Sequence, residues 1–420
     1  MVKNNCIILS ALCCAVIFYG RFLPLKAAKP YRSLLPLNSV SSLDGSVASN
    51  PTKLSSGRFY AVDFAVNTVA GTVGSSSVKA AAYGSVPVYI PTSIVESLYP
   101  GRLYTQGILV EKGERMEFFG SWNEKKKLFI VEKATYKQYS YSFWGSLCHF
   151  RALCRLSFKR FLFPWGKAGG LLLALFSGTR EYTSAEDSDA FRKAGLSHIL
   201  ALSGMHLSFF AAMTERAGNT FWGRSRRTWT RLGGICVFVW FAGFSPSLLR
   251  AFLFCLVLTM LELFHCKEID GLAVLAAVFL LHLLIKASDM FSISFMLSYA
   301  AMAGILCFSP SCQRFLVRFF PPAIAASLSA AIAAQVATAP LSLMLFGCLM
   351  PAGIIASVIV SPLAGIFLAA GAGGILLCLL LPFLAPPTAF VLNGIYSLCL
   401  FFVHAFAKIP AFILKDKEFL

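Results

Sequence analysis

The pattern of hydrophobic and polar positions divides the chain into two contrasting regions. Between Arg58 and Tyr141, short alternating or β-branched runs such as SVPVYIP and KLFIVEKATYK are separated by clusters of Gly, Asn and Ser. Period-two alternation bounded by turn residues predicts strands, and about five of them in this length predict a small antiparallel barrel or sandwich. From Gly169 onward, long apolar runs predict helices instead.

The helical region is apolar enough to cross a membrane. Runs suited to a hydrocarbon core of about 30 Å recur from Gly195 to Phe406. The composition agrees, because 57% of the residues are hydrophobic and 13% are charged, whereas soluble domains carry about 25% charged residues. These values exclude an ordinary soluble protein. They predict a polytopic α-helical membrane protein with a small all-β domain near its N-terminus and about ten membrane segments.

These patterns predict five successive parts. They are an N-terminal transmembrane anchor over residues 1–25, a Ser- and Pro-rich linker over 26–57, the β domain over 58–141, a basic amphipathic interfacial helix over 142–167 and a multi-helix membrane domain over 168–420. A cleaved signal peptide is the alternative for the first part, but no clear small-x-small cleavage site follows its short apolar run. The segment GILLCLLLPFLAPP is short for a crossing and is also compatible with a re-entrant turn.

The charges and the cysteines narrow the picture. The formal net charge of +18 suits basic loops that orient membrane helices, attraction to anionic lipid, or an anionic polymer such as nucleic acid. If the segments alternate, most basic loops are cytoplasmic, which predicts that the β domain lies outside the cytoplasmic membrane. The 13 cysteines all lie outside the stretch from Gly20 to Leu147, which excludes a disulfide framework in the β domain.

The predicted interfacial helix carries a basic stripe. Arg151, Arg155 and Lys159 recur every four residues and therefore share one helical face. Such a face suits the headgroup layer, where each basic residue contributes about 1 kcal/mol of attraction to an anionic leaflet. The same stripe is also suited to a nucleic-acid backbone, because Lys and Arg neutralise phosphates without reading sequence.

The segment AGLSHILALSGMHLSFFAAM, from Ala194 to Met213, combines an apolar character with several polar groups. At 100° per residue, its small residues form one narrow stripe suited to close helix packing. His206 points nearly opposite that stripe, with Ser203 and His198 on either side. A polar face at membrane depth requires water, a partner helix or a substrate. Histidines bonded to neighbouring backbone carbonyls are the structural alternative.

Further polar groups follow at membrane depth. Arg250 lies one turn inside a helix that Pro246 can start, where a cation opposes the helix dipole, although its side chain can also extend to the interface. Gln335 and Thr338 share one face of a later segment, and Ser298 lies in FSISFMLSYAAMAG. Each is an ordinary interhelical hydrogen-bonding residue by itself. Together they suit a polar pathway through the helices.

The motif GLSHILALSGMH closely resembles the signature of the ComEC family of competence proteins, and GFSPSLLRAF, FSISFMLSYAAMAGI, ATAPLSLMLFG and IIASVIVSPLAG resemble further family segments in the same order. The family often has Asn where Ser357 stands and an acid-Pro pair near IKASDM. Many relatives also carry a C-terminal metallo-β-lactamase-like nuclease domain, whereas this sequence has no His-x-His-x-Asp-His cluster. The resemblance therefore implies DNA translocation without degradation of the other strand.

The resemblance also implies the location and the mechanism. The chain would be a multi-pass protein of the cytoplasmic (inner) membrane that carries single-stranded DNA into the cell, without enzymatic activity, cofactor or metal. DNA would meet an oligonucleotide-binding (OB) β domain, with Tyr83, Tyr89, Tyr104 and Phe129 as stacking or core residues. It would then pass the DNA-binding candidates Arg151, Arg155 and Lys159. The implied translocation path contains His198, Ser203, Gly204, His206, Arg250, Ser298, Gln335 and Thr338.

The partners implied are single-stranded DNA, membrane lipid, a DNA receptor and a separate motor ATPase, because the sequence has no G-x-x-x-x-G-K loop. The membrane potential is the alternative energy source, and a second copy of the chain is a further candidate partner. Two other functions stay open. One is an intramembrane hydrolase with Ser203 as nucleophile and His265, His282 or His404 as base. The other is a transporter of a small solute or lipid.

Overall fold

The computed structural model describes residues 31–54, 57–73, 76–95, 108–136, 143–222, 227–265 and 270–413 of the chain. The chain forms two compact units, which are described separately. The β unit comprises Lys26–Leu173 and Thr179–Tyr182, and the helical unit comprises Met1–Leu25, Ala174–Gly178 and Thr183–Leu420. The predicted anchor over residues 1–25 lies outside the described residues.

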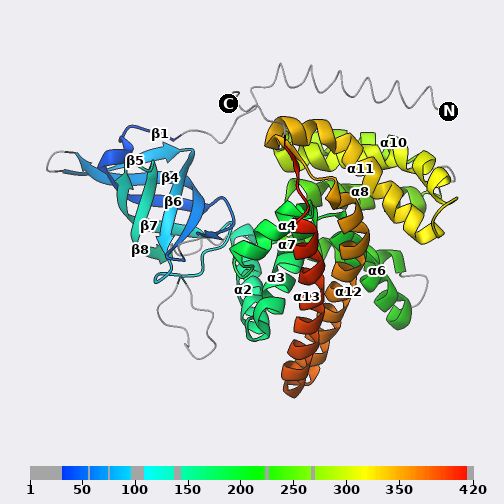
Figure 1. Cartoon of the computed structure of the whole chain (residues 1–420). Helices are drawn as coiled ribbons and strands as arrows, with labels where there is room; N and C mark the ends of the chain where they lie inside the picture. The colour runs from blue at the N-terminus through cyan, green and yellow to red at the C-terminus, as the bar shows by residue number, and fades with distance from the viewer. Residues whose placement is uncertain are drawn as a thin grey trace. The chain divides into compact units, whose positions relative to one another are not determined.

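The β unit contains a closed barrel of the OB type (Figure 1). Its walls are β2 (Val40–Val47), β4 (Phe59–Val73), β6 (Ser85–Pro91), β7 (Arg115–Asn123) and β8 (Leu128–Tyr136). The strands pair in the order β4-β2-β7-β8-β6, and β6 pairs again with β4, which closes the sheet. The β6–β8 pair is parallel and the other barrel pairs are antiparallel. The predicted small β domain near the N-terminus is therefore confirmed.

Strict alternation explains why these strands form a barrel. In β6, Val86, Val88 and Ile90 are at most 1% exposed and point inward, while the residues between them lie closer to the surface. Phe64 and Phe118 meet in the same core with ring centroids 4.6 Å apart. One side of each strand thus supplies the apolar core and the other faces water, as the period of two requires.

The barrel begins earlier in the chain than predicted. The expected linker over residues 26–57 contains β1 (Arg32–Ser33), β2 and β3 (Thr52–Lys53), while β5 (Ser76–Tyr83) extends the sheet beyond the barrel. β2 is a barrel strand that pairs with both β4 and β7. Its sequence VSSLDGSV is rich in Ser and Gly, and register shifts interrupt its alternation, so the buried positions Val40, Leu43 and Val47 show no simple period of two.

The helices follow the apolar runs. They are α2 (Phe143–Leu162), α3 (Gly166–Ser177), α4 (Ala185–Lys193), α5 (Ser197–Leu200), α6 (Gly204–Trp222), α7 (Arg227–Ala242), α8 (Pro246–Leu263), α9 (Gly271–Lys286), α10 (Ile293–Leu316), α11 (Pro322–Phe346), α12 (Ala352–Leu380) and α13 (Ala385–Ala407). Six spans from Pro246 to Ala407 are long and apolar enough to cross a membrane, among the residues that the structure describes. The chain is therefore a multi-pass membrane protein.

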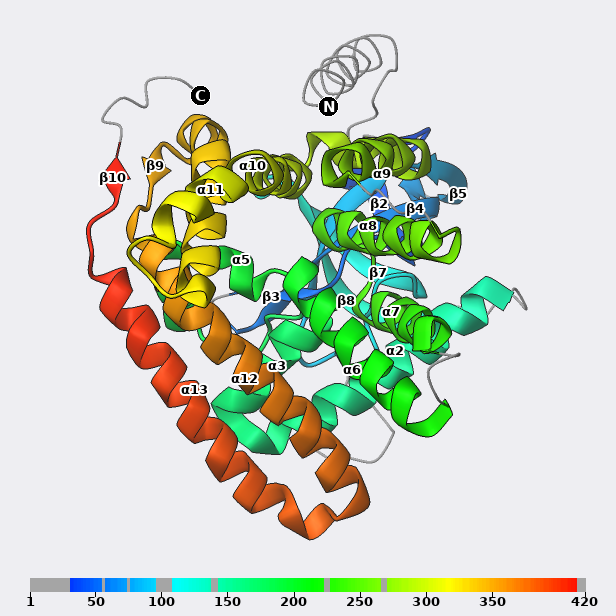
Figure 2. The ribbon, with the colours of Figure 1, turned by 90° about the vertical axis from the view of Figure 1, so that its right-hand side faces the viewer.

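The six spans are fewer than the ten segments expected. In the described part of the chain, α7 has only 16 residues, and α6 carries Glu215 and Arg216 within its second half. The segment GILLCLLLPFLAPP is not a separate helix, because it forms the end of α12, a short 3-10 turn at Pro382–Leu384 and the start of α13. Figure 2 shows α12 and α13 as one long antiparallel hairpin.

The basic stripe of α2 lies inside the β unit and not on its surface. Arg155 and Lys159 are 2% and 8% exposed. Lys159 Nζ lies 2.8 Å from Glu111 and 3.3 Å from Glu181, and Arg155 Nε lies 3.2 Å from Glu111. Arg155 also donates to the Thr179 hydroxyl at 2.6 Å. These groups form a buried ion cluster that holds α2 and the loop after α3 against the residues preceding β7.

This arrangement corrects the prediction for Arg155 and Lys159. Neither side chain is presented to lipid headgroups or to a nucleic-acid backbone, because both are committed to carboxylates. Arg151, half-buried on the same face, is within electrostatic range of Glu111. The spacing correctly placed the three cations on one face. It could not reveal that the acids facing them come from 48 and 22 residues away in the sequence.

The two acids of the cluster differ in their preferred charge. Burial by itself raises the pKa of Glu111, but the attraction of Arg155 and Lys159 outweighs it and the pKa is lowered. The pKa of Glu181 is raised instead, because burial outweighs the attraction of Lys159 and the charge of Glu111 adds to it. The fold therefore stabilises the charged form of Glu111 and disfavours the charged form of Glu181, relative to an exposed carboxyl group.

We expect Glu111→Gln to lower the free energy of unfolding by about 3–5 kcal/mol, as when one partner of a buried ion pair is removed. Glu181→Gln is the matched control, and we expect a loss of about 1 kcal/mol or less because glutamine resembles the protonated form that burial favours. Thermal unfolding of the purified variants measures both values. Equal losses in the two variants would contradict the assigned charges.

The same assignment predicts opposite dependences on pH. The stabilisation from Glu111, whose pKa is lowered, is present above the ordinary carboxyl value of about 4.3 and is lost as the pH falls through the lowered value. The contribution of Glu181, whose pKa is raised, is present below that ordinary value and is lost as the pH rises through the raised one. Unfolding midpoints measured across pH should therefore lose acid sensitivity in Glu111→Gln. In Glu181→Gln they should lose the decline on the alkaline side.

Candidate functional site

The candidate site begins where the helical path breaks between α5 and α6. The N–H of Ser203, the residue before α6, donates to His206 Nδ1 at 3.2 Å, and the Ser203 hydroxyl lies 3.2 Å from the same nitrogen. In a capping box, the third helical side chain accepts from the N-cap N–H, and His206 fills this position. The paired residues of the SGMH sequence therefore fix the start of α6.

This bond also determines the proton on the imidazole. Because Nδ1 accepts a hydrogen bond, the neutral ring carries its proton on Nε2. His206 is 0% exposed, and Nε2 has no hydrogen-bond partner among the described residues. Burying such a donor costs free energy unless an acceptor reaches it. The first turn of α6 thus holds a buried donor directed away from its own cap.

The first turn of α8 lies against the start of α6. Ser245 caps α8 by accepting from the Leu248 N–H at 3.3 Å, and Pro246 starts the helix. A Cβ placed on Gly204 would lie 3.8 Å from Arg250 Nη2 and 3.7 Å from Ala251 Cβ. These are ordinary van der Waals distances, so the guanidinium lies directly beside the start of α6.

The helix α10 closes the same region. The Ser298 hydroxyl donates to the Ser247 hydroxyl at 3.2 Å, which links α10 to the first turn of α8. The phenol of Tyr299 is within electrostatic range of Arg250. The structure thus places Gly204 beside Arg250 and links Ser298 to Ser247. It pairs Ser203 with His206, and His206 is within electrostatic range of His198.

A buried hydrogen-bond network also engages the hydroxyl of Tyr299. Its hydroxyl lies 3.2 Å from His282 Nδ1, and His282 Nε2 lies 3.4 Å from Asp289. Asp289 also pairs with Lys286 at 2.6 Å. Sequence reasoning missed Ser247, Tyr299 and this hydrogen-bond network. Asp289, the acid of IKASDM, was a visible signal of it in the sequence.

The remaining predicted path residues lie around Gly195 or bond within their own helix. The Cβ of a residue at Gly195 would lie 3.0 Å from the Cα of Gly353, so α12 approaches this glycine closely. His198 bonds to the backbone of Gly195, and Gln335 donates to the Met350 carbonyl at 3.1 Å. Thr338 donates only to carbonyls of α11, at 2.8 and 3.3 Å. These two hydrogen bonds of Thr338 lie within its own helix and are not specific to a pathway.

The candidate bases of a hydrolase lie in other environments. His282 belongs to the hydrogen-bond network with Tyr299 and Asp289. His404 Nε2 lies 3.6 Å from Asp187, which also accepts a hydrogen bond from Tyr396 at 2.8 Å. His265 follows the C-terminal end of α8, about 22 Å along the helix from Arg250 at 1.5 Å per residue. His206 is the histidine bonded to Ser203.

The aromatic candidates of the β unit differ in their exposure to solvent. Among the aromatic candidates of the β unit, Phe129 is fully buried, Tyr89 is half-buried and Tyr83 is 70% exposed, while Tyr104 lies outside the described residues.

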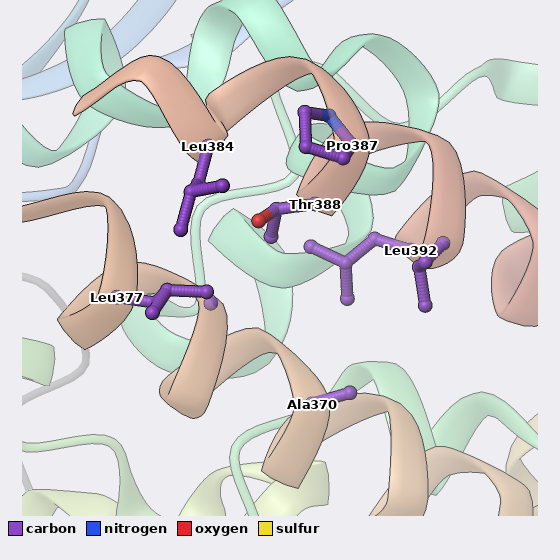
Figure 3. Close-up of a pocket in the computed structure, with 8 residues that line it drawn as sticks. Ala370, Leu377, Leu384, Pro387, Thr388 and Leu392 are labelled. Atoms are coloured by element: carbon purple, nitrogen blue, oxygen red, sulfur yellow. The ribbon is translucent and has the colours of Figure 1, made fainter. Parts of the chain in front are cut away.

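In the helical unit, a groove of about 310 Å³ between α12 and α13 is lined almost entirely by apolar side chains, including Leu377, Leu384 and Leu392 (Figure 3). No group of three or more metal-ligating residues occurs within the described ranges.

Comparisons with known proteins agree with this description. The family model described as "Competence protein" matches residues 175–418. A relative, "Uncharacterized protein YcaI" of Escherichia coli (strain K12), is 28% identical over 169 residues. This alignment spans 38% of the chain and only 22% of the relative. No solved structure matches the chain.

The matched region contains the whole arrangement around α6, α8 and α10 and covers more than half of the sequence. Its membrane helices and the preceding OB-type barrel are the features that the motifs implied. The chain belongs to the Competence protein family, the ComEC-like family indicated by its motifs.

Proposed function

We propose that this protein forms a channel that carries single-stranded DNA across the cytoplasmic membrane during natural transformation. The observation that carries the proposal is the helix break before α6. There, Ser203 is bonded to His206, and the next residue, Gly204, lies beside Arg250, within the segment that matches the Competence family. Non-helical backbone at membrane depth is tolerated where it is buried in protein or lines a polar cavity. A channel gives this break and its donors a purpose.

The chemistry around the break suits a conducted polyanion. Arg250 supplies one positive charge, while Ser203, His206, Ser247 and Ser298 supply neutral polar groups. A transported substrate must be bound weakly enough to leave, so a single cation among neutral donors suits passage better than a fully basic pore. His198 and Gln335, near Gly195, are proposed to extend the same path.

The OB-type barrel is proposed to receive the strand outside the membrane. OB barrels bind single strands by stacking bases on aromatic side chains, and Tyr83 is exposed on β5. A separate receptor and a motor or the membrane potential would supply capture and energy. Lipid surrounds the helices, and a dimer is a further possibility for the assembly.

The distance of 3.2 Å between the Ser203 hydroxyl and His206 Nδ1 favours a second candidate, an intramembrane serine hydrolase. A catalytic base must hold the nucleophile's proton and be oriented by a third group. Here Nδ1 also accepts the Ser203 N–H, and Nε2 lacks an orienting acceptor among the described residues. A helix cap explains the contact more completely than a catalytic pair.

We expect Ser203 to remain unlabelled by a fluorophosphonate probe, because its neighbouring histidine is engaged in capping and lacks the third member of a catalytic set. The purified protein would be treated with the probe and digested, and mass spectrometry would locate any adduct. A heat-denatured sample controls for nonspecific labelling. Labelling that is specific to the folded protein and absent in Ser203→Ala would favour the hydrolase.

In a naturally competent host, deletion of the gene should abolish entry of labelled DNA into the cytoplasm while DNA bound at the surface persists. We expect His206→Gln to reach the membrane, because glutamine can serve at the same capping position, but to reduce uptake through the changed geometry of the buried donor. Ser208→Ala, at an exposed position of the same helix, is the matched control and should retain uptake.

The channel proposal fails if cytoplasmic entry is unchanged by deletion. A small-solute or lipid transporter would then become the leading candidate. Binding of DNA to the purified protein with a steep loss at raised salt would separate a DNA channel from such a transporter.

A further inference from the structure

The turn that joins α12 to α13 is built for an apolar environment. The sequence has no Asp, Glu, Lys or Arg between Arg318 and Lys408, and only Leu381 separates the two candidate membrane spans of the hairpin. Leu380 and Phe383, on either side of that residue, are 80% and 71% exposed. Exposed apolar surface of this kind marks a site of contact with a partner or with a membrane. In a pair of spanning helices, this surface is suited to contact with lipid.

The backbone of the same turn needs little water. The Leu381 N–H donates to the Leu377 carbonyl at 2.8 Å, and the Leu384 N–H donates to the Leu381 carbonyl at 3.0 Å. Pro386 and Pro387, in the first turn of α13, have no N–H. The first N–H groups of a helix otherwise lack intrahelical partners, and each unsatisfied group in hydrocarbon costs several kcal/mol. The chemistry of the turn therefore suits immersion in lipid.

The groove between α12 and α13 lies next to this turn (Figure 3). Ala370, Gly374 and Leu377, spaced four and three residues apart, form its wall on α12. Leu384 and Leu392, eight residues apart, belong to the opposite wall. Two of the three residues on α12 are small, so that wall does not fill the space between the helices. The groove runs along the hairpin for about two helical turns.

The lining of the groove is suited to an apolar occupant. Seven of its eight residues are apolar, and the eighth is Thr388, whose hydroxyl accepts a hydrogen bond from the Cys378 thiol at 3.6 Å. A buried water typically needs two to four polar partners, while an empty space deprives the side chains around it of dispersion contacts. The volume of about 310 Å³ has room for about ten groups of the size of a water molecule or a methylene.

The dimensions of the groove distinguish a lipid chain from a protein helix. Its volume, spread over two helical turns, corresponds to a mean width of about 6 Å. A helix with its side chains is about 10–12 Å wide, so neither a second copy of a helix nor a further segment of this chain fits as a helix. Val391, one of the lining residues, is 57% exposed. The groove therefore opens onto the lipid-facing surface of the hairpin, where an acyl chain can enter without crossing a polar boundary.

We propose that the groove between α12 and α13 binds one acyl chain of a membrane phospholipid. The chain fills the space beside Ala370 and Gly374 and joins the two helices near the turn through dispersion contacts, which are a main source of cohesion between helices in a membrane. The hairpin has no charged residue that could select a headgroup. Binding is therefore expected to depend on the chain and not on the headgroup. This inference does not rest on the proposed channel function.

The test locates the acyl chain by photochemical labelling. The full-length protein is placed in nanodiscs of phosphatidylcholine that include a small share of the same lipid with a diazirine near the end of one acyl chain. After irradiation and digestion, mass spectrometry identifies the labelled residues. We expect label on Leu384 and Leu392 of the groove, and on Phe390, which is 83% exposed and accessible to any surrounding lipid. The same experiment with phosphatidylglycerol should give the same labelling of the groove.

We expect Ala370→Phe to remove most of the label from Leu384 and Leu392, because the added ring occupies the space that the acyl chain needs. The label on Phe390 should stay unchanged. Ala369→Phe makes the same substitution at the neighbouring exposed position of α12, so it is the matched control and should be labelled as the wild type is. If Ala370→Phe does not fold, Ala370→Leu fills less of the groove and provides the comparison.

Two results would overturn the acyl-chain site. One is a wild-type protein in which Phe390 is labelled but the groove residues are not. The other is equal labelling of the groove in the wild type and in the folded Ala370 variants. Label in the groove with phosphatidylglycerol alone would also count against the site, because a headgroup would then hold the lipid in place of the groove.

Discussion

The membrane domain depends on how the chain satisfies its backbone where the helical path is interrupted at α6. In an apolar environment an unpaired N–H costs several kcal/mol, so a helix cannot simply begin there. The Ser203 N–H is accepted by His206 Nδ1, and this side chain is then fixed in position and tautomer. The capping bond therefore does two things: it permits the break, and it turns the other imidazole nitrogen into a donor for something else.

The close packing around the break follows from the small residues beside it. Gly195 allows α12 to approach closely, because a Cβ on Gly195 would lie only 3.0 Å from the Cα of Gly353. A side chain at Gly195 would be strained as well as crowded, because its φ is +73°. At Gly204, by contrast, a Cβ would make ordinary van der Waals contacts with Arg250 and Ala251.

Several of these features could be predicted from the sequence. Period-two alternation identified the barrel, and the apolar runs identified the membrane helices, because both patterns report directly on which face is buried. The Ser-rich β2 was missed because its pairing on both sides is a non-local property. The burial of Arg155 and Lys159 was missed for the same reason. A helical repeat shows that two residues share a face, but it does not show that Glu111 and Glu181 cover that face. In the candidate site, the motif indicated Ser203 and His206, whereas the contacts with Ser247 and Tyr299 required three helices to be placed together.

The distribution of acids distinguishes two kinds of cation in this protein. In the β unit, Arg155 and Lys159 meet two carboxylates, and the ion cluster is complete without any ligand. In the helical unit, Asp187 is engaged by Tyr396 and His404, Glu215 by Arg227, and Asp289 by Lys286 and His282. Arg250 is only partly buried, lies beside Gly204 and has no such partner in the described structure. Neutral polar groups, the Tyr299 phenol and the hydroxyls of Ser247 and Ser298, lie near it instead. A charge that no carboxylate compensates suits the proposed passage of a polyanion better than a cation committed to an acid.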